Sequence, residues 1–331
     1  MKTIDVCGLG NGLLDIFVEI TEAEFEQLGF ERATMRLVES VEQRELLGRF
    51  SDRSPVMASG GSVANSIIAL AQLGGRAAFI GSFGEDEYGD FYRREFDGLG
   101  IRLNRSVSAP VDTGTAVALI TPDGERTMRT HLGAAALLTP EHVSPELIGG
   151  ATWLFLEGYL FANPLNGQPT IRRAIEVARA HGTKLAITCS ESFVIETFND
   201  AIESALEHAD LVFANESEAM ALAGVKTVEG AFERLAGRFP ALVVTRGSEG
   251  AMVHYEGVVG RVPAFACKPR DLTGAGDMFA GAFLYGVNHG VPPLDAARGA
   301  CYLAMHVVSR VGARLHHGAR TLWNDCLEGR V

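Results

Sequence analysis

Hydrophobic residues in this chain follow two alternating spacings. In "SVANSIIALAQLGG" (62–75), apolar residues recur every three or four positions until a glycine pair ends the run, which predicts a helix. The next residues, "RAAFIGSFG", form an apolar run that predicts a buried strand. The same alternation continues in helix patterns at 87–100, 169–182 and 216–224 and strand patterns at 151–158, 184–190 and 210–215. It favours an α/β fold whose central, mostly parallel sheet is covered by helices on both faces.

Two stretches interrupt this alternation with strand patterns that lack helices between them. Residues 15–39 contain "IFVEI" and "TMRLVE", and residues 113–133 contain two strand-like runs around a Pro-Asp-Gly turn. We expect these pieces to pair into a small β-sheet that forms a lid over a cleft. The chain is then a single domain, 1–331, with a core of 1–14, 40–110 and 134–331 and lid segments 15–39 and 111–133.

Composition narrows the class of protein. The 331 residues are 47% hydrophobic, which is enough for a large core. The net charge of −12 and the absence of a Lys/Arg run argue against a nucleic-acid partner. The five scattered cysteines predict neither a zinc site nor a disulfide framework, and they fit a reducing cytoplasm. The most apolar stretch, "ATWLFLEGYLFA", contains Glu157, so we expect a cytoplasmic protein without membrane contact that acts on a small molecule.

A candidate anion site lies in "DLTGAGDMFAGAFLYG" (271–286), which follows the strand-like "VPAFAC". A helix pattern starts near Asp277, so Gly274, Ala275 and Gly276 lie at its N-terminus, where free N–H groups and the helix dipole favour phosphate. The Asp277 carboxylate could accept the proton of a hydroxyl that attacks a phosphoryl group. An acidic residue in a first helical turn is also favoured by the dipole alone. Neither a P-loop nor a protein-kinase catalytic loop is present.

A second glycine cluster, "SGGSVANS" (59–66), also precedes a helix. Together with "DLTGAGD" it makes the chain resemble the PfkB, or ribokinase-like, family of carbohydrate and nucleoside kinases. Residues 60–89 are similar to the family's N-terminal signature and residues 271–284 to its C-terminal signature, with "NESE" (215–218) and "TRGSEGA" (245–251) between them. The resemblance implies a ribokinase-like fold, in which helices flank a mostly parallel sheet and a small β-sheet forms the lid.

The resemblance also implies roles for individual residues in an ATP- and Mg²⁺-dependent phosphoryl transfer. Asp277 would be the general base, and Gly274, Ala275 and Gly276 would form the anion hole. Asn215, Thr245 and Gly247 would bind the nucleotide, Asn215 and Glu218 would hold Mg²⁺ indirectly, and Asp271 would lie near the K⁺ that some relatives use. Asn215 and Glu218 also have the spacing of a helix capping box, and the two roles are compatible.

The acceptor is expected to be a nucleoside. Five stretches are similar to the adenosine-kinase branch: "GLGNGLLDI", "ERTMRTHLGAA", "EGYLF", "SESFV" and "ACYLAMHVVSRVGAR". The expected acceptor residues are Asn11, Asp15, Gly60, Gly61, Asn65 and Arg126, with aromatic walls from Phe17, Phe161 and Phe193. Each phenylalanine could instead belong to the core, and Arg126 could be a solvated strand residue. Arg129 and the polar "ITCSESF" depart from the branch, and the Arg129 side chain would either contact an acidic sugar or face solvent.

Three alternatives to an adenosine kinase stay open. The chain could phosphorylate ribose, fructose or an acidic sugar, or it could bind a nucleotide or nucleoside without turnover, although Asp277 argues against the latter. A nicotinamide oxidoreductase is suggested by "VCGLGNGLLDI" (6–16), but the dinucleotide fingerprint requires glycine at its sixth position, which is Leu13 here, and a strand pattern follows instead of a helix. We therefore expect this loop to bind the acceptor. The free edge of a lid sheet also predicts a homodimer through the lid.

Overall fold

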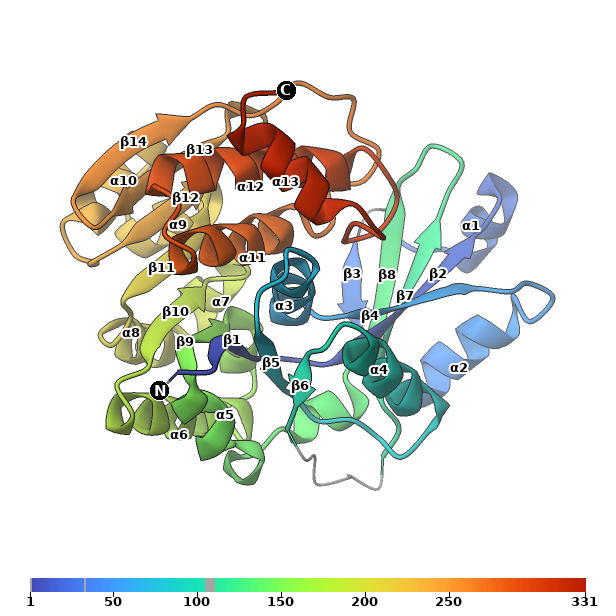
Figure 1. Cartoon of the computed structure of the whole chain (residues 1–331). Coiled ribbons are helices and arrows are strands. Elements are labelled where there is room, and N and C mark those ends of the chain that lie inside the picture. Colours follow the sequence, from blue (N-terminus) through green and yellow to red (C-terminus); the bar gives the residue numbers. More distant parts are fainter. Residues whose placement is uncertain (1, 33, 105–110) are drawn as a thin grey trace.

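The computed structural model describes residues 2–32, 34–104 and 111–331; residue 33 of the expected lid and residues 105–110 of the expected core lie outside the described part. Within that part, nine strands form the main sheet in the order β14-β13-β12-β11-β10-β9-β1-β5-β6 (Figure 1). In this spatial order, the strands from β12 through β1 to β6 are parallel to one another, and β13 and β14 add an antiparallel edge. Their bounds are β1 (Ile4–Leu9), β5 (Ala77–Ile80), β6 (Arg102–Leu103), β9 (Ala151–Glu157), β10 (Lys184–Thr188), β11 (Leu211–Asn215), β12 (Leu242–Thr245), β13 (Ala251–Tyr255) and β14 (Val258–Val262).

Helices cover both faces of this sheet, as its continuous apolar strands require. One face packs against α3 (Ser62–Gln72), α4 (Glu87–Gly98), α11 (Ala275–Asn288), α12 (Pro293–Val308) and α13 (Ala319–Leu327). The other packs against α5 (Pro145–Gly150), α6 (Gly167–Ala180), α7 (Ser192–Thr197), α8 (Asn199–Leu206), α9 (Glu216–Ala223) and α10 (Val228–Ala236). Short 3₁₀ turns lie at Gly133–Leu137, Pro140–His142, Gly158–Ala162 and Gly247–Glu249.

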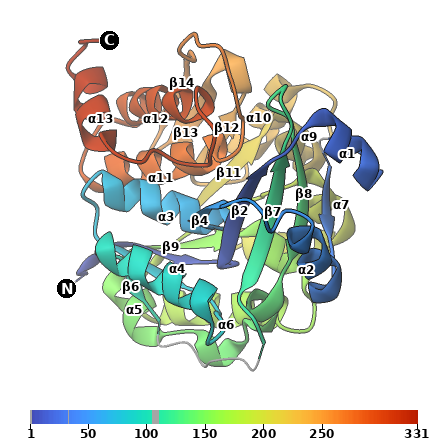
Figure 2. The ribbon, with the colours of Figure 1, turned by 90° about the vertical axis from the view of Figure 1, so that its right-hand side faces the viewer.

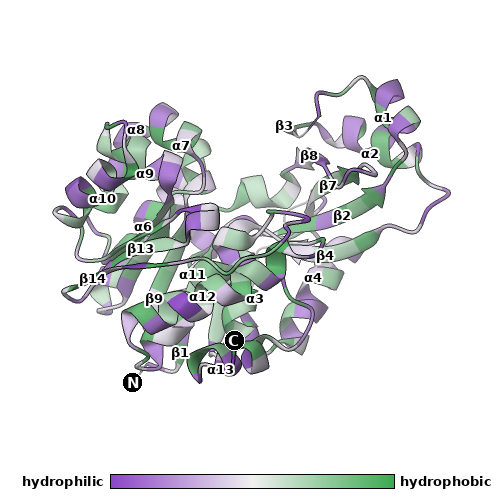
Figure 3. Ribbon diagram, turned by 90° about the horizontal axis from the view of Figure 1, so that it is seen from above, coloured by the Kyte–Doolittle hydropathy of each residue, from purple (hydrophilic) through white to green (hydrophobic). Residues whose placement is uncertain are grey.

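The second sheet is the lid, and it projects from one side of the core (Figures 2 and 3). Its five described strands run in the order β3-β8-β7-β2-β4. Their bounds are β2 (Leu13–Glu19), β3 (Met35–Leu37), β4 (Val56–Gly60), β7 (Gly114–Ile120) and β8 (Arg126–His131). Strand β2 pairs with β7 and β3 with β8, so the two separated segments form one sheet, as the sequence predicts.

The lid contains more of the chain than the expected segments. Strand β4 pairs with β2, and α2 (Ser40–Gly48) packs its Leu46 into the lid's apolar cluster, although both lie beyond residue 39. Helix α1 (Glu22–Leu28) contributes Phe25 to the same cluster. The hydrophobic pattern of the sequence did not predict β4, because β4 is an edge strand that lacks a buried face: its Val56 and Met57 are exposed.

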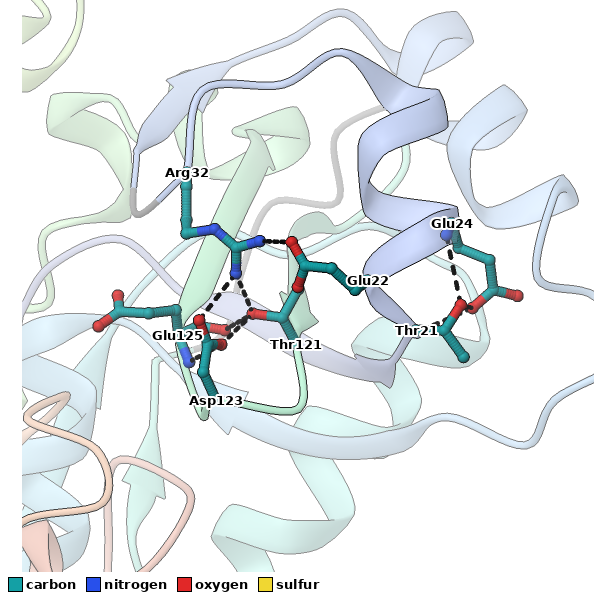
Figure 4. A network of polar contacts seen from close by, with 7 residues as sticks. All are labelled: Thr21, Glu22, Glu24, Arg32, Thr121, Asp123 and Glu125. Carbon is teal, nitrogen blue, oxygen red and sulfur yellow. Dashed lines mark hydrogen bonds and ion pairs between the residues drawn. The ribbon is translucent and has the colours of Figure 1, made fainter.

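The outer part of the lid is tied together by one arginine (Figure 4). Arg32, in the chain after α1, donates to Thr121 Oγ1 at 2.8 Å and to Asp123 at 3.0 Å in the β7–β8 turn, and it also pairs with Glu22. Thr21 and Glu24 form a capping box at the start of α1. These contacts hold α1 against the hairpin, away from the core.

The structure differs from the sequence expectations at the antiparallel edge of the main sheet. The strand-like "VPAFAC" is not a strand beyond Val262, where β14 ends, and the β13–β14 hairpin before it was not predicted. All five cysteines are free thiols. No helix within the described ranges is long and apolar enough to cross a membrane.

Candidate active site

The opening glycine loop follows β1 at the carboxyl edge of the sheet. There Glu157, the last residue of β9, accepts hydrogen bonds from Asn11 Nδ2 at 2.8 Å and from the Val63 amide at 3.2 Å. A Cβ on Gly10 would clash with this carboxylate. Burial raises the pKa of Glu157 to about 7. Sequence reasoning did not select Glu157; the available signal was a carboxylate at the end of an otherwise apolar central strand.

Asp277 lies where the N-termini of α3 and α11 meet. Ser62 Oγ donates to Asp277 Oδ1 at 2.7 Å, and Asn65 Nδ2 donates to Oδ2 at 3.1 Å. The two helices approach closely because Gly281 has no Cβ to clash with the Ser66 carbonyl. Burial raises the pKa of the Asp277 carboxyl to about 6, and the two hydrogen bonds oppose that rise. A carboxylate with this pKa is ionised at neutral pH and can still accept a proton.

The residues expected to form an anion site beside Asp277 lie at a helix terminus. Helix α11 begins at Ala275 after Gly274, whose φ of 74° lies in the left-handed region. A Cβ on Gly274 would clash with the Ala313 backbone, so glycine is required for both reasons. The first amides of the 14-residue helix have no intrahelical acceptor, and the dipole adds positive potential, so this end can hold a phosphoryl group next to Asp277.

A cleft of about 850 Å³ lies between the lid and the core. Its walls come from β2 and β4 of the lid and from residues 311–316, which follow α12. Asp277 is not itself part of these walls, but Asn65 lines the cleft and contacts Asp277. The cleft therefore leads to the Asp277 carboxylate through Asn65.

Asp15 faces this cleft because β2 alternates strictly. Leu14 and Ile16 are buried under the lid helices, while Asp15 and Phe17 lie on the opposite side and line the cleft. Gly60 leaves room for the Asp15 carboxylate, with which a Cβ would clash. Burial raises the pKa of Asp15 to about 7, against the opposing charges of two nearby arginines, Arg314 and Arg126.

Gly61 makes the connection between the opening loop and α3. Its φ of 102° is unfavourable for other residues, and a Cβ there would clash with the Asn11 carbonyl. The structure thus brings the opening loop against the glycines that precede α3. Asp15 and Asn65 line the cleft, Asn65 contacts Asp277, and Asn11 contacts Glu157.

Arg126 connects the lid to the loop that precedes α11. Its guanidinium, on β8, forms an ion pair with Asp271 at 2.6 Å, donates to Thr273 Oγ1 at 3.1 Å and lies 4.9 Å from the Phe17 ring centre. Asp271 also accepts hydrogen bonds from the amides of Thr273 at 3.1 Å and Gly312 at 2.7 Å. The Asp271 carboxylate, expected beside a monovalent cation, is engaged here by a guanidinium.

Two of the three expected aromatic walls do not line the cleft. Phe17 does, but Phe161 is 1% exposed within the core, where it packs with Ile171 and Ile175 of α6. Phe193 is 44% exposed on α7, outside the cleft lining. The expectation for Phe161 is wrong because "EGYLF" turns into a 3₁₀ helix after β9, which directs this ring into the core. The apolar wall is instead mostly aliphatic: Val56, Met57, Ile120 and Val311.

Arg129 neither faces solvent nor reaches the cleft. It is 2% exposed and lies 4.0 Å from the Phe30 ring centre, where it donates to the Met128 carbonyl at 2.8 Å. Because it is three residues beyond Arg126 on the same strand, it points to the opposite face of the lid sheet. Both expectations for Arg129 are therefore wrong.

The expected nucleotide residues lie together at the same edge of the sheet. Asn215 and Thr245 are paired at the ends of β11 and β12, and Gly247, with φ of 52°, starts the following turn. Asn215 and Glu218 form the predicted capping box of α9: the Glu218 carboxylate accepts from the Asn215 backbone amide at 3.0 Å, and the Glu218 amide donates back to Asn215 Oδ1 at 2.9 Å.

The donor set around Glu218 fits Mg²⁺ held through water. Burial raises the pKa of Glu218 to about 7, and both of its oxygens already accept a hydrogen bond from Asn215. No group of three or more His, Cys, Asp or Glu side chains that could hold a metal directly occurs in the described residues. Each carboxylate oxygen keeps a second lone pair, which can accept from a metal-bound water molecule.

Comparisons with known proteins agree with this geometry. The profile of the pfkB family carbohydrate kinases matches residues 33–317. Adenosine kinase 1 of Arabidopsis thaliana is 27% identical over 329 residues, covering 92% of this chain and 94% of that protein. Fructokinase-1 of Oryza sativa subsp. japonica is 33% identical over 241 residues, covering 69% and 73%.

Solved structures extend the similarity to the whole fold. The adenosine kinase from Sinorhizobium meliloti superposes with a TM-score of 0.87 at 31% identity, covering 97% of this chain and 99% of that one. A probable sugar kinase from Rhizobium etli gives a TM-score of 0.88 at 30% identity, covering both chains completely. With Asp277 at the N-terminus of α11 and a lid across the cleft, this chain belongs to the pfkB family of carbohydrate kinases and is a phosphotransferase that acts on an alcohol group.

Proposed function

We propose that this protein transfers the γ-phosphoryl group of ATP to the hydroxymethyl group of a nucleoside, with adenosine as the acceptor. The observation that carries the proposal is the position of Asp277, held by Ser62 and Asn65 in the first turn of α11, at the end of a cleft with polar and apolar walls. The similarity to adenosine kinases over nearly the whole chain supports the choice of acceptor.

The proposed transfer is direct and in line. The ionised Asp277 carboxylate accepts the acceptor's hydroxyl proton as its oxygen bonds to the γ-phosphorus and the bond to the ADP oxygen breaks. The amides of Gly274, Ala275 and Gly276 stabilise the charge on the transferred phosphoryl oxygens. Family membership implies Mg²⁺, which neutralises phosphate charge when bound, and Glu218 and Asn215 would hold its water ligands. Thr245 and Gly247 would line the nucleotide.

Arg126 has the position to respond to phosphate. In the structure it bridges the lid to Asp271 and Thr273, next to the anion site. An incoming phosphoryl group offers the guanidinium a competing partner, and the two oxygens of a phosphate suit its fork of donors. Arg126 would thereby couple phosphate binding to lid closure, which keeps water away from the transfer.

The cleft suits a nucleoside because it combines two kinds of wall. Phe17, Ile120 and Val311 offer apolar surface for a flat base, while Asp15 and Asn65 offer acceptors for ribose hydroxyls. The charges do not favour an acidic sugar: the guanidinium groups of Arg126 and Arg314 are already paired with Asp271 and Glu95, and the Asp277 carboxylate is ionised at neutral pH. An acceptor carboxylate would be repelled by Asp277.

Fructose is the second candidate acceptor, because fructokinases reach 34% identity with this chain. A coupled ADP-release assay with adenosine, other nucleosides, ribose and fructose distinguishes the two. We expect turnover with adenosine at the highest kcat/KM; turnover with fructose but none with any nucleoside would contradict the choice of acceptor. Turnover with none of them would favour a silent binding protein.

Asp277→Asn tests the base in the same assay. The amide keeps the shape of the side chain but cannot accept the proton, so kcat should fall by about 10²–10⁴ while the KM for ATP changes little. Near-normal turnover by this variant would remove Asp277 from its proposed role. Thermal unfolding of the variant, measured in parallel, shows whether the loss comes from chemistry or from folding.

A further inference from the structure

Arg314, in the segment after α12, occupies the acceptor cleft although no predicted motif includes it as a site residue. It is 6% exposed and lines the cleft together with Asp15 and Asn65. Its Nη2 donates to both oxygens of Glu95, at 2.8 and 3.0 Å, and Glu95 Oε2 also accepts from the Ser59 amide at 3.0 Å. Contacts from α4 and β4 therefore hold the guanidinium in one orientation.

The other terminal nitrogen of Arg314 has no partner. Arg314 Nη1 is buried and has no hydrogen-bond partner within the described residues, and the same holds for Asn65 Oδ1 and Ser59 Oγ. All three atoms belong to side chains that line the cleft. A buried polar atom without a partner destabilises the fold, and the more so when it is charged. A ligand that supplies the missing partners removes this cost.

Charge limits what that ligand can be. The Arg314 charge is balanced by Glu95, so the guanidinium adds a donor to the cleft without adding net positive charge. It also lies close enough to Asp15 to oppose, more than any other charged group, the rise that burial causes in the pKa of that carboxyl. The cleft thus offers a fixed donor beside a fixed acceptor. A hydroxyl group both accepts and donates, so it can bond with the Arg314 donor and the Asp15 acceptor together. A pair of adjacent hydroxyls does so with less strain.

We propose that Arg314 determines acceptor specificity by donating from Nη1 to one oxygen of an uncharged vicinal diol whose hydroxyl hydrogens are accepted by Asp15 and Asn65. The inference rests on the proposed function and adds to it a residue that recognises the adjacent hydroxyl groups of the acceptor. Arg314 is then a binding residue, while Glu95 positions it.

Arg314→Lys is the sharpest test. A lysine can keep the ion pair with Glu95 through its single nitrogen, but it has no second nitrogen for the acceptor. We expect the KM for the acceptor to rise about tenfold or more, since a hydrogen bond to a charged group is worth about 1.5–3 kcal/mol, and the KM for ATP to stay unchanged. Arg320→Lys, on the exposed side of α13, is the matched control and should leave both values unchanged.

Acceptors that lack one hydroxyl group show whether Arg314 contacts the acceptor or only supports the structure of the cleft. The wild type and Arg314→Lys are compared on adenosine and on its 2′-deoxy and 3′-deoxy analogues, or on the corresponding deoxy sugars if a sugar is the acceptor. For the hydroxyl that Arg314 contacts, removing the oxygen should reduce kcat/KM by about tenfold more in the wild type than in the variant, which keeps only the contact with Asp15 or Asn65. Equal penalties in both proteins, or an unchanged acceptor KM in the variant, would overturn the proposal.

Folding and the proposed function are controlled separately. If Arg314→Lys does not fold, as judged by its thermal unfolding, the double variant Arg314→Gln with Glu95→Gln removes both charges together and carries the same comparison. If the wild type phosphorylates neither nucleosides nor neutral sugars, the proposed function fails, and this inference fails with it. If the wild type is active and only the Arg314 effects are missing, the inference alone is wrong.

Discussion

At the scale of single residues, the site is a group of buried carboxylates whose hydrogen bonds decide their chemistry. Asp277 has two donors and a pKa near 6, whereas Asp15, Glu157 and Glu218 have pKa values near 7. Burial is the first cause of the rise in each case, and Asp277 adds repulsion to the other three. The hydrogen bonds from Ser62 and Asn65 lower the pKa of Asp277 against the effect of burial, and so they favour the ionised form of the proposed base at neutral pH.

Ser62→Ala should move the pH profile of the enzyme. The ionised Asp277 is the active form, so kcat/KM falls as pH drops through its pKa of about 6. The Ser62 hydroxyl stabilises the ionised form; without it the pKa rises, and the acidic limb should shift up by about one pH unit. Ser66→Ala, one turn further along α3, is the control because Ser66 contacts the Ser62 carbonyl rather than Asp277. An unmoved or downward-shifted limb would contradict the assignment.

At the scale of elements, the site depends on helix ends brought close to neighbouring backbone. The N-terminus of α11 can approach the segment after α12 only because Gly274 has no side chain, and α3 can approach α11 only because of Gly281. These close approaches explain why the predicted glycine motifs lie at the site. The predicted motifs therefore include the glycines at the proposed anion hole but say little about the cleft, whose walls come from lid strands and from residues 311–316.

Gly274→Ala and Gly290→Ala form a matched pair at the two ends of α11. Both glycines have φ of 74°, so both substitutions should reduce the free energy of unfolding by about 1–2 kcal/mol through backbone strain. Only at Gly274 would the new Cβ meet backbone, that of Ala313, whereas nothing lies within 4 Å at Gly290. We expect Gly274→Ala alone to lower kcat, by about 10²-fold as the anion hole shifts. Denaturant unfolding and the ADP-release assay measure the two effects; equal kcat values would argue against the anion hole.

At the scale of the whole molecule, the burial of carboxyl groups makes the stability of the fold sensitive to pH. The carboxyl groups of Asp15, Glu157, Glu218 and Asp277 all have folded-state pKa values above the ordinary value near 4. Groups of this kind stabilise the fold fully below the unfolded pKa, and their contribution is lost as pH rises through the folded pKa.

The lid sheet has open edges, on which Met35, Leu37 and Val56 are exposed. A homodimer formed through the lid stays a prediction.

The ligand-free protein should therefore lose thermal stability as the pH rises from about 4.5 to about 7, the window between the two sets of pKa values. Glu157→Gln removes one of the titrating groups, so the decrease in Tm across this window should be smaller, whatever the absolute Tm. Glu26→Gln, at an exposed position of α1, controls for the substitution itself. A decrease as steep in Glu157→Gln as in the wild type would mean that Glu157 does not titrate in this range.

The sequence alone determined the α/β fold, the family and the phosphate end of the site, because these depend on local patterns: helix and strand periodicity, a glycine where φ is positive, an aspartate in a first turn. Only the tertiary structure decided the acceptor end. Glu157 contacts Asn11, and Arg314 contacts Glu95 and lies near enough to Asp15 to lower its pKa against the effect of burial, across long sequence separations set by strand order. Likewise, strand register turned Arg129 away from the cleft, and a 3₁₀ turn buried Phe161. Residue type and local spacing do not specify which side of a sheet or which distant partner a side chain will meet, since that depends on how the elements pack.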